Sequence, residues 1–460
     1  MLSISVSDVS KAVGGRIVST LPPESFEEKK INAVLMDSRK IEKNNLFVAI
    51  KGERADGHNF ISEVIKKGAA AVICDHVPKD FTEGVCIVVE DTVKALQDLA
   101  EWYRSNLKVK VVGITGSVGK TSTKEMLWAV LSYRFKTQKT LGNYNNEIGL
   151  PLTVLAIEAE TEVVVLEMGI SDFGEMRLLS KIARPDICVI TNIGQSHLEN
   201  LGTRDGILKA KTEIFEYRNP KGPIFLNGDD DKLITIKEVS GTKPVFYGFN
   251  EENYARAEEI ESLGLKGTKM KICLGENKFF AQISMIGNHM VKNALVASAV
   301  GEYLGMTFEE IKKGLEKAET IGGRSNLIPF GEGFIIDDCY NAAPTSMMAA
   351  LDTLTLAKGS KTAVLGDMFE LGKDEASMHF EVGRYAAGKN LSKIIFIGKL
   401  SHFMYEGAKS ENTETKLRYF ENLEDFFEVI KEEISNEGNV LVKASNGMHF
   451  DKIVSFLKEM

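Results

Sequence analysis

The sequence predicts an α/β protein with largely parallel sheets, and two features of the chain lead to that fold class. Short apolar runs of strand length recur, and amphipathic stretches of helical period lie between many of them. Runs that are apolar throughout are typical of parallel strands buried on both faces. The clearest strand candidates are 69–73, 163–169, 187–194 and 393–398.

The length of the chain predicts about three domains, because 460 residues exceed what one hydrophobic core usually supports. A helical segment ends near 105–107, directly before an apolar run, and a second break lies near 322–324. Domain boundaries fall where one such unit ends and the next begins. The expected domains are 1–107, 108–324 and 325–460.

Composition and charge exclude several classes of protein. The chain is 43% hydrophobic and 26% charged, which excludes a disordered or fibrous protein. A net charge of −9 argues against a protein that coats nucleic acid. Five scattered cysteines without a Cys-x-x-Cys motif indicate neither a disulfide framework nor a zinc knuckle. Because there is no run of 18 apolar residues and no leader-like N-terminus, we expect a cytoplasmic enzyme that does not insert into membranes.

The segment from Val109 to Leu131 has the pattern of a phosphate-binding loop. An apolar strand runs into Gly116-Ser117-Val118-Gly119-Lys120-Thr121-Ser122, where a helix begins. Glycines let backbone N–H groups turn toward a phosphate, the helix start favours negative charge, the lysine reaches the outer phosphates and the threonine can hold Mg²⁺. The alternative is a glycine-rich turn with a solvated lysine, which the strand–loop–helix context disfavours.

The spacing of this loop departs from the common G-x-x-x-x-G-K-[ST] pattern. That pattern requires glycine at position 114, where this chain has Ile114, so the loop is a T-G-S-x-G-K-T variant. The difference argues against a GTPase or a simple nucleotide kinase.

Two more polar residues follow apolar runs in the same region. Glu167 stands where the run 163–169 reaches the carboxyl edge of the predicted sheet, and a carboxylate near the loop threonine is placed like an anchor for Mg²⁺. His197 closely follows the run 187–194. Each also has a plainer interpretation, as an exposed glutamate at a turn and as a histidine with an ordinary structural role.

Lys211 lies in the middle of an apolar helical stripe. Ile207, Leu208, Ile214 and Phe215 are three or four residues from it. One interpretation is a lysine that extends along the apolar face until its ammonium reaches water. The other is a buried lysine with a lowered pKa, whose neutral amine could take part in chemistry. Periodicity alone favours the first.

Polar clusters also follow apolar runs in the C-terminal third. Clusters at the carboxyl edge of a parallel sheet, facing a second domain, suit a cleft that closes over ATP and an acceptor. They are Asp337, Asp338 and Asn341, then Asp367 and Glu370, then Lys443 and Ser445.

Together these motifs resemble those of the Mur ligase family, the ATP-dependent amide-forming enzymes of peptidoglycan precursor synthesis. The matching segments run almost from end to end, and they are Asp37-Ser38-Arg39, Lys51 to Phe60, Thr115 to Ser122, Gly142 to Thr153, Glu167 to Gly169, Thr191 to Gly202, Ala210 to Phe215 and Gly287 to Ala294. Two positions depart. Met290 stands for the family's asparagine after the histidine, and Lys443-Ala444-Ser445-Asn446 stands where K-G-S-R is usual, so no role is assigned to 443–450.

The resemblance implies a small uridine-sugar domain, a central P-loop ATPase domain and a C-terminal Rossmann-like domain. It also implies a role for each matching residue. The implied ATP-binding residues are 116–122, Asn293, Arg324 and Asp338. The implied ligands of two Mg²⁺ ions are Thr121 and Glu167 for the first, and His197 and an N-carboxylated Lys211 for the second. The implied contacts of the UDP-sugar are Ser38, Arg39, Asn145 and Asn146. The implied catalytic residues are Lys120, Glu167, His197 and Lys211.

The implied activity is ATP-dependent formation of an amide bond by a monomer. The C-terminal segments DDCYNAAPTSM and LGDMFELG resemble the member that joins D-alanyl-D-alanine to the carboxylate of UDP-N-acetylmuramoyl-tripeptide through an acyl phosphate. Two alternatives stay open: a ligase similar to folylpolyglutamate synthetases, and an ATP-dependent switch protein that does not ligate. The residues 37–39 and 51–60 argue against both, because they match the uridine-sugar domain. The sequence does not distinguish lysine from diaminopimelate as the third residue of the tripeptide.

Overall fold

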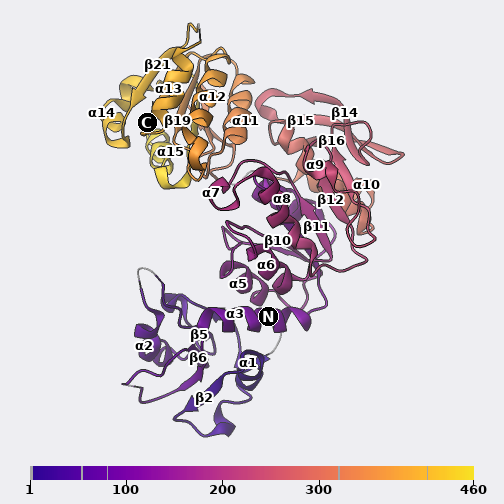
Figure 1. Ribbon diagram of the computed structural model, residues 1–460, viewed down its shortest axis with the longest axis vertical. Helices are drawn as coiled ribbons and strands as arrows, with labels where there is room; N and C mark the ends of the chain where they lie inside the picture. The colour runs from indigo at the N-terminus through magenta and orange to yellow at the C-terminus, as the bar shows by residue number, and fades with distance from the viewer. Residues whose placement is uncertain (1–3, 53–54, 80, 320–321, 412) are drawn as a thin grey trace.

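The structure is a computed structural model that describes residues 4–52, 55–79, 81–319, 322–411 and 413–460. Glu53 and Arg54, in the matching segment 51–60, lie outside the described residues. The chain forms an α/β fold that is built around three main sheets, which follow one another along the sequence from the bottom of Figure 1 to its top. The predicted fold class is confirmed.

The N-terminal sheet runs in the order β2-β7-β6-β5-β4, and only β2 is antiparallel to its neighbour. Its strands are β2 (Arg16–Ser19), β4 (Val34–Leu35), β5 (Leu46–Val48), β6 (Ala71–Cys74) and β7 (Val85–Val88), and the short strands β1 (Ile4–Ser5) and β3 (Lys30–Ile31) pair with each other. The helices and 3-10 turns are α1 (Val6–Val13), η1 (Pro23–Ser25), η2 (Ser38–Lys40), η3 (Gly57–Phe60), α2 (Ile61–Lys66) and α3 (Thr92–Ser105).

Helix α3 connects the N-terminal sheet to the central part of the molecule (Figure 1). The hydroxyl of Tyr103 donates to the carbonyl of Ile157 at 2.7 Å, and Nε of Arg104 donates to the carbonyl of Ala183 at 2.8 Å. One hydrophobic core contains buried side chains of α1 and α3 together with side chains of the central sheet. The predicted break at 105–107 therefore falls at the end of a helix that packs on both regions.

The central sheet runs in the order β16-β15-β14-β13-β12-β11-β8-β10-β9. The strands are β8 (Lys110–Thr115), β9 (Thr137–Lys139), β10 (Val163–Glu167), β11 (Ile187–Ile190), β12 (Ile224–Asn227), β13 (Val245–Gly248), β14 (Ala255–Ser262), β15 (Thr268–Leu274) and β16 (Asn277–Ile283). The helices and 3-10 turns are α4 (Lys120–Leu131), α5 (Gly149–Leu155), α6 (Glu175–Ala183), α7 (Leu198–Leu201), α8 (Arg204–Thr212), η4 (Glu213–Phe215), η5 (Leu233–Thr235), η6 (Gly264–Lys266), α9 (Asn288–Tyr303) and α10 (Phe308–Glu316).

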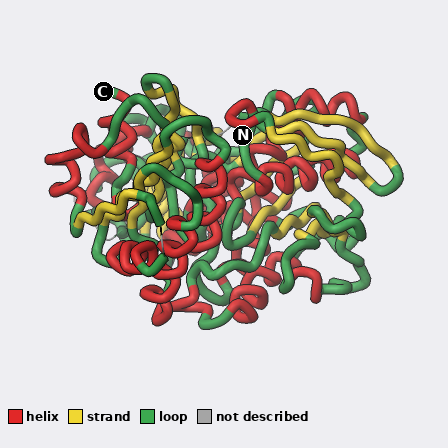
Figure 2. Tube along the Cα trace, turned by 90° about the horizontal axis from the view of Figure 1, so that it is seen from above, coloured by secondary structure: helices red, strands yellow, loops and turns green. Residues whose placement is uncertain are grey.

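Both faces of the parallel part of this sheet are covered by helices, which explains its continuous apolar runs. Val111 faces the layer that contains α3, α5, α6 and α8, whereas its neighbour Val112 faces α4, α9 and α10. The sequence analysis did not predict that β14, β15 and β16 continue the sheet as an antiparallel extension, which projects at the right of Figures 1 and 2.

The C-terminal sheet runs in the order β17-β18-β22-β19-β20-β21, and only β17 is antiparallel to its neighbour. Its strands are β17 (Asn326–Phe330), β18 (Gly333–Asp337), β19 (Lys361–Gly366), β20 (Lys393–Ile397), β21 (Lys416–Phe420) and β22 (Asn439–Lys443). The helices and 3-10 turns are α11 (Pro344–Thr355), η7 (Gly372–Asp374), α12 (Glu375–Ala387), α13 (Ser401–Lys409), α14 (Leu423–Glu433), η8 (Asn446–Met448) and α15 (Asp451–Lys458). Helices α11 to α13 cover one face and α14 and α15 the other, an arrangement like that of Rossmann folds.

The strand candidates are confirmed with shifted ends. Strands β6, β10, β11 and β20 occupy the four apolar runs, and three of those runs extend past the strand to a glycine. All five cysteines are free and buried. In the part of the chain that the structure describes, no helix combines the length and apolar character that crossing a bilayer requires.

Candidate active site

A cavity of about 1080 Å³ lies between the phosphate loop and the C-terminal sheet. Its lining comes from the carboxyl ends of central strands, from the start of α9 and from the polar segment after β18. The cavity brings together most of the residues singled out from the sequence: residues 117–122, Asn145, Asn146, Glu167, His197, Asn293, Arg324 and Asp338. Gly116, Lys211, Ser38 and Arg39 do not line it.

Two glycines shape the phosphate loop. Gly116 has φ 147°, and a Cβ there would lie 1.9 Å from Oγ1 of Thr191, so any side chain would collide with the end of β11. Gly119 has φ 86° and stands directly before the first residue of α4. The loop therefore needs glycine at these positions for steric reasons that do not depend on a ligand.

The end of β11 holds the loop in place. Backbone N–H groups of Ser117 and Val118 donate to the carbonyl and side-chain oxygens of Asn192, both at 3.0 Å. The hydroxyl of Thr191 donates to the carbonyl of Val118 at 2.6 Å. These bonds fix the loop before a phosphate arrives, so a ligand would not have to order it.

Lys120 begins α4 and folds back over the loop. Its Nζ donates to the carbonyl of Gly116 at 2.8 Å and to that of Ser117 at 3.4 Å. Burial lowers the pKa of Lys120, the carboxylate of Glu167 opposes this and the positive charge of Arg324 lowers the pKa further. The lysine thus lies where a bound phosphate would supply the negative charge that pairs with its ammonium.

Thr121 and Glu167 form a pair of oxygen donors beside the loop. The hydroxyl of Thr121 donates to Oε2 of Glu167 at 2.8 Å, and Nδ2 of Asn145 donates to Oε1 at 2.9 Å. Burial raises the pKa of Glu167, but the charges of Lys124, Lys120 and Arg324 outweigh burial, so the pKa lies below its ordinary value. The group is a carboxylate at neutral pH. A hydroxyl and a carboxylate fit Mg²⁺, which prefers oxygen ligands.

His197 contacts the C-terminal part of the chain across the cavity. Its Nδ1 lies 2.8 Å from Oε2 of Glu370, and both residues have positive φ, 58° and 63°. The hydrogen bond from His197 outweighs burial and lowers the pKa of Glu370. The sequence analysis singled out both residues separately but did not predict their contact.

The C-terminal wall of the cavity is built from two pairs of side chains. Lys443 is buried, and its Nζ lies 2.6 Å from Oδ2 of Asp338. The guanidinium of Arg324 lies over the ring of Tyr340, 3.9 Å from the ring centroid. Lys443 lines the cavity, although the sequence analysis gave the segment 443–450 no role.

Asn293 joins α9 to the helix that follows the phosphate loop. Its Oδ1 accepts a hydrogen bond from the hydroxyl of Thr123 at 2.9 Å, and its Nδ2 lies 3.5 Å from the sulfur of Met290. The unusual methionine therefore packs against the side chain of Asn293. Burial also lowers the pKa of the neighbouring His289.

Lys211 is buried, with 1% of its surface exposed, so the interpretation in which its ammonium reaches water is wrong. Burial lowers its pKa well below the ordinary value, and the charge of Lys120 lowers it further. Within the described part of the chain, no carboxylate raises this pKa by pairing with the ammonium. Helix α8 ends at Thr212 and continues as a 3-10 turn, so Ile214 and Phe215 do not share its α-helical stripe as predicted.

Ser38 and Arg39 lie at the carboxyl end of β4 in the N-terminal sheet. Ser38 is buried, and its carbonyl accepts a hydrogen bond from Nζ of Lys67 at 3.0 Å. The side chain of Arg39 is 86% exposed and pairs with Asp37. The structure therefore separates these two residues from the other predicted site residues.

The family models that match this chain cover three successive segments of it. A model described as "Mur ligase family, catalytic domain" matches residues 30–110, "Mur ligase middle domain" matches 114–301, and "Mur ligase, glutamate ligase domain" matches 323–446. Along its whole length the chain is 40% identical to the UDP-N-acetylmuramoyl-tripeptide–D-alanyl-D-alanine ligase of Bacillus subtilis, covering 99% of that protein. The chain belongs to the Mur ligase family.

Solved structures of Mur ligases agree with this membership. A MurF crystal structure from Acinetobacter baumannii has a TM-score of 0.90 and 34% identity, covering all of this chain and 99% of that one. The MurF ligase of Thermotoga maritima, solved in complex with ADP, has a TM-score of 0.81 and 28% identity, covering 93% of this chain and 97% of that one.

The cavity of this Mur ligase also contains residues that the sequence analysis missed. Asp229 follows β12 and pairs with Lys292 of α9 at 2.9 Å, and Lys292 lies over the ring of Phe249, 5.1 Å from its centroid. A signal for the first existed, because Asp229 follows the apolar run that ends at Asn227, and polar residues at such strand ends were singled out elsewhere. Lys292 and Phe249 carry no such signal, since only the fold brings them there.

Proposed function

We propose that this chain joins D-alanyl-D-alanine to the C-terminal carboxylate of UDP-N-acetylmuramoyl-tripeptide, using ATP, in peptidoglycan precursor synthesis. The observation that carries the proposal is the cavity, in which a phosphate loop faces Asp338 paired with the buried Lys443. The full-length similarity to ligases with that name supports the choice of substrates. A volume of about 1080 Å³ has room for more than one of the reactants.

The reaction needs a site that collects negative charge. A carboxylate is a poor electrophile, so its oxygen first attacks the γ-phosphorus of ATP, ADP leaves and an acyl phosphate forms. The amine of D-alanyl-D-alanine then attacks the carbonyl carbon, the amine loses a proton and phosphate leaves. Lys120 and the N–H groups of residues 119–122 would bind the phosphates, because Asn192 already accepts those of Ser117 and Val118. Arg324 and Asn293 would complete the nucleotide site.

Magnesium fits the oxygen donors of this site. Thr121 and Glu167 would hold one Mg²⁺ ion, and His197 would help to hold a second. Bound there, Mg²⁺ would neutralise phosphate charge and polarise the phosphorus–oxygen bonds. The protein's own part is to keep Glu167 ionised, through Lys124 and Lys120, and to orient it through Asn145 and Thr121.

We propose that Lys211 is N-carboxylated in the active protein. A neutral lysine amine reacts with dissolved CO₂, releasing a proton and giving a carbamate with two anionic oxygens. Burial, the charge of Lys120 and the absence of a pairing carboxylate among the described residues favour the neutral amine. The carbamate would add oxygen ligands for the second Mg²⁺ ion together with His197.

Residues outside the phosphate loop would bind the sugar nucleotide. Ser38 and Arg39, at the carboxyl edge of the N-terminal sheet, would bind the UDP part of the sugar nucleotide, and Asn145 and Asn146 the part that reaches the cavity. The three functional regions correspond to 1–107, 108–324 and 325–460. We further propose that the protein works as a monomer in the cytoplasm, where these substrates occur.

The test is to mix the purified protein with ATP, Mg²⁺, each candidate tripeptide carrier and D-alanyl-D-alanine. A pentapeptide product by mass spectrometry and ADP release that requires both peptides would support the proposal. ADP release without either peptide substrate, or ADP release that a protein partner stimulates, would favour the switch protein. Extension of a folate substrate by glutamate would favour the folylpolyglutamate synthetase-like ligase. Parallel tripeptides ending in lysine and in diaminopimelate identify the third residue.

A further inference from the structure

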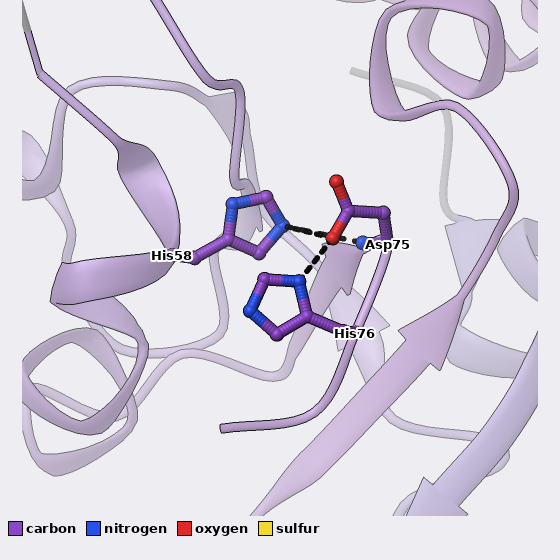
Figure 3. A group of neighbouring side chains, drawn as sticks. All are labelled: His58, Asp75 and His76. Carbon is purple, nitrogen blue, oxygen red and sulfur yellow. Dashed lines mark hydrogen bonds and ion pairs between the residues drawn. The ribbon is translucent and has the colours of Figure 1, made fainter. Parts of the chain in front are cut away.

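A group of metal-ligating side chains lies outside the cavity, in the N-terminal sheet region. His58 comes from η3, and Asp75 and His76 directly follow β6 (Figure 3). Each of the three residues has one ligand atom, a ring nitrogen or a carboxylate oxygen, that lies within 4.8 Å of those of the other two. The two imidazole rings stack with centroids 4.6 Å apart, so both rings present nitrogen atoms to the same carboxylate.

The ring of His58 is oriented before any ion binds. Its Nδ1 donates to Oδ1 of Asp56 at 2.7 Å, which leaves Nε2 as the nitrogen that carries the lone pair. Gly57 allows this position, because a Cβ there would lie 2.8 Å from the backbone nitrogen of Ile50. His58 itself is 6% exposed. Histidine ligands of metals are commonly supported in this way, by a carboxylate that fixes the tautomer and leaves the lone pair on the other nitrogen.

The second ring nitrogen of His58 lies near the carboxylate of Asp75. This atom, Nε2, lies 3.2 Å from Oδ1 of Asp75, and Nδ1 of His76 contacts that same oxygen. The backbone N–H of Asp75 also donates to Nε2, at 3.2 Å. Three electron-pair donors therefore converge, with one long N–H bond between them. A cation bound there would interact with the lone pair of Nε2 and with the carboxylate oxygen, which lie 3.2 Å apart without a proton between them.

We propose that His58, Asp75 and His76 bind one divalent transition-metal ion, with Zn²⁺ as the best match. Two imidazoles and one carboxylate are the ligand types that Zn²⁺ takes, and they are too rich in nitrogen for Mg²⁺ or Ca²⁺. Zn²⁺ replaces the N–H bond to Nε2, displaces the proton from Nδ1 of His76 and keeps water as a fourth ligand. Asp56 acts as the positioning residue behind His58.

The ion would link two segments that lie at the carboxyl edge of the N-terminal sheet. Asp75 and His76 follow β6, and η3 with α2 covers the neighbouring strand β5. At the end of α2, Nζ of Lys67 donates to the carbonyl of Ser38 on the same edge. The site is thus placed to stabilise this edge, and its role does not depend on the reaction in the distant cavity.

The test is a Zn²⁺ titration of the full-length, metal-stripped protein in competition with a chromophoric chelator, without nucleotide. The comparison covers wild type, His76→Ala, Asp75→Asn, Asp56→Asn and the matched surface control His402→Ala. The ring of His76 is largely exposed, so His76→Ala should fold, and Asp75→Asn provides a second variant of similar shape. Co²⁺ absorption in the same proteins reports ligand number independently.

Wild type and His402→Ala should each bind one Zn²⁺ more than His76→Ala and Asp75→Asn. Asp56→Asn should keep the stoichiometry and bind about 10- to 100-fold more weakly, as loss of a carboxylate behind a histidine ligand does. Zn²⁺ should raise the Tm of wild type and leave that of His76→Ala unchanged. Equal stoichiometry and affinity for wild type, His76→Ala and Asp75→Asn would overturn the proposal.

Discussion

The phosphate loop and the C-terminal wall face each other across one cavity, but their charged side chains are held in different ways. In the loop, Lys120 donates to the carbonyl of Gly116, only four residues away. In the wall, Asp338 pairs with Lys443, which comes from a distant strand. Lys120 is held by carbonyls of its own loop, which the end of β11 keeps in place, whereas the wall exists only when β18 and β22 are paired. Changes in the loop should therefore affect chemistry, and changes across the cavity should affect assembly of the site.

The largest effect should follow Lys120→Ala. The ammonium is needed for phosphate charge and not for packing, so kcat should fall about 10³-fold while the protein remains folded. Steady-state kinetics and circular dichroism measure the two quantities. Lys108→Ala, an exposed lysine just before the same strand, should behave like wild type. A folded Lys120→Ala protein with near-normal turnover would contradict the assignment of this segment as a phosphate-binding loop.

Lys211→Ala should come next, with a loss of about 10²-fold or more in kcat, because a carbamate that supports Mg²⁺ disappears. Lys211→Arg should not restore activity, since arginine keeps the charge and cannot be carboxylated. Formate or acetate should partly rescue Lys211→Ala by supplying carboxylate oxygens. Lys209→Ala, an exposed lysine on the same helix, is the control. An arginine variant with normal activity would return Lys211 to a structural role.

Glu370→Gln tests the contact across the cavity and should have a modest effect. The pair with His197 is partly exposed, with side-chain exposures of 24% for His197 and 60% for Glu370, so it contributes at most about 1 kcal/mol. We expect KM to rise about two- to fivefold with little change in kcat, and the difference to shrink at high salt. Glu421→Gln, exposed in the same region, is the control. A large loss of kcat would instead mean that Glu370 takes part in the chemistry.

The smallest effect on the nucleotide site should follow deletion of residues 1–90, which keeps α3. ATP affinity should stay within about threefold of the full chain, because separate α/β units can often fold alone. Binding of the uridine-sugar peptide should be lost in calorimetry, and undiminished binding would refute the substrate role of this region. Deletion of 1–107 should give an insoluble chain, since it also removes α3, whose Leu99 and Tyr103 are fully buried.

The parts that could be predicted from the sequence are those whose chemistry is local. The phosphate loop follows from a strand, glycines and a lysine in one segment, and Glu167 follows from its place at the end of an apolar run. Periodicity did not predict that Lys211 is fully buried. An apolar stripe indicates which way a side chain points, but not whether other segments cover its end. The end of α8 at Thr212 has the same cause, since a stripe does not mark where a helix stops.

Other features depend on contacts between distant segments. The pairs His197–Glu370 and Asp338–Lys443 form only when separate parts of the chain meet. The antiparallel extension did leave a signal, because Lys269, Met270, Lys271 and Ile272 alternate between exposed or half-buried and fully buried positions.

The most direct measurement follows an oxygen atom through the reaction. With ¹⁸O in the carboxylate of UDP-N-acetylmuramoyl-tripeptide, formation of an acyl phosphate makes one carboxylate oxygen the bridge to phosphorus. Mass spectrometry of the products should then find one ¹⁸O atom in each released phosphate. When D-alanyl-D-alanine is omitted and the intermediate is not hydrolysed, no labelled phosphate should be released. Phosphate free of ¹⁸O alongside pentapeptide product would contradict ligation through an acyl phosphate at this site.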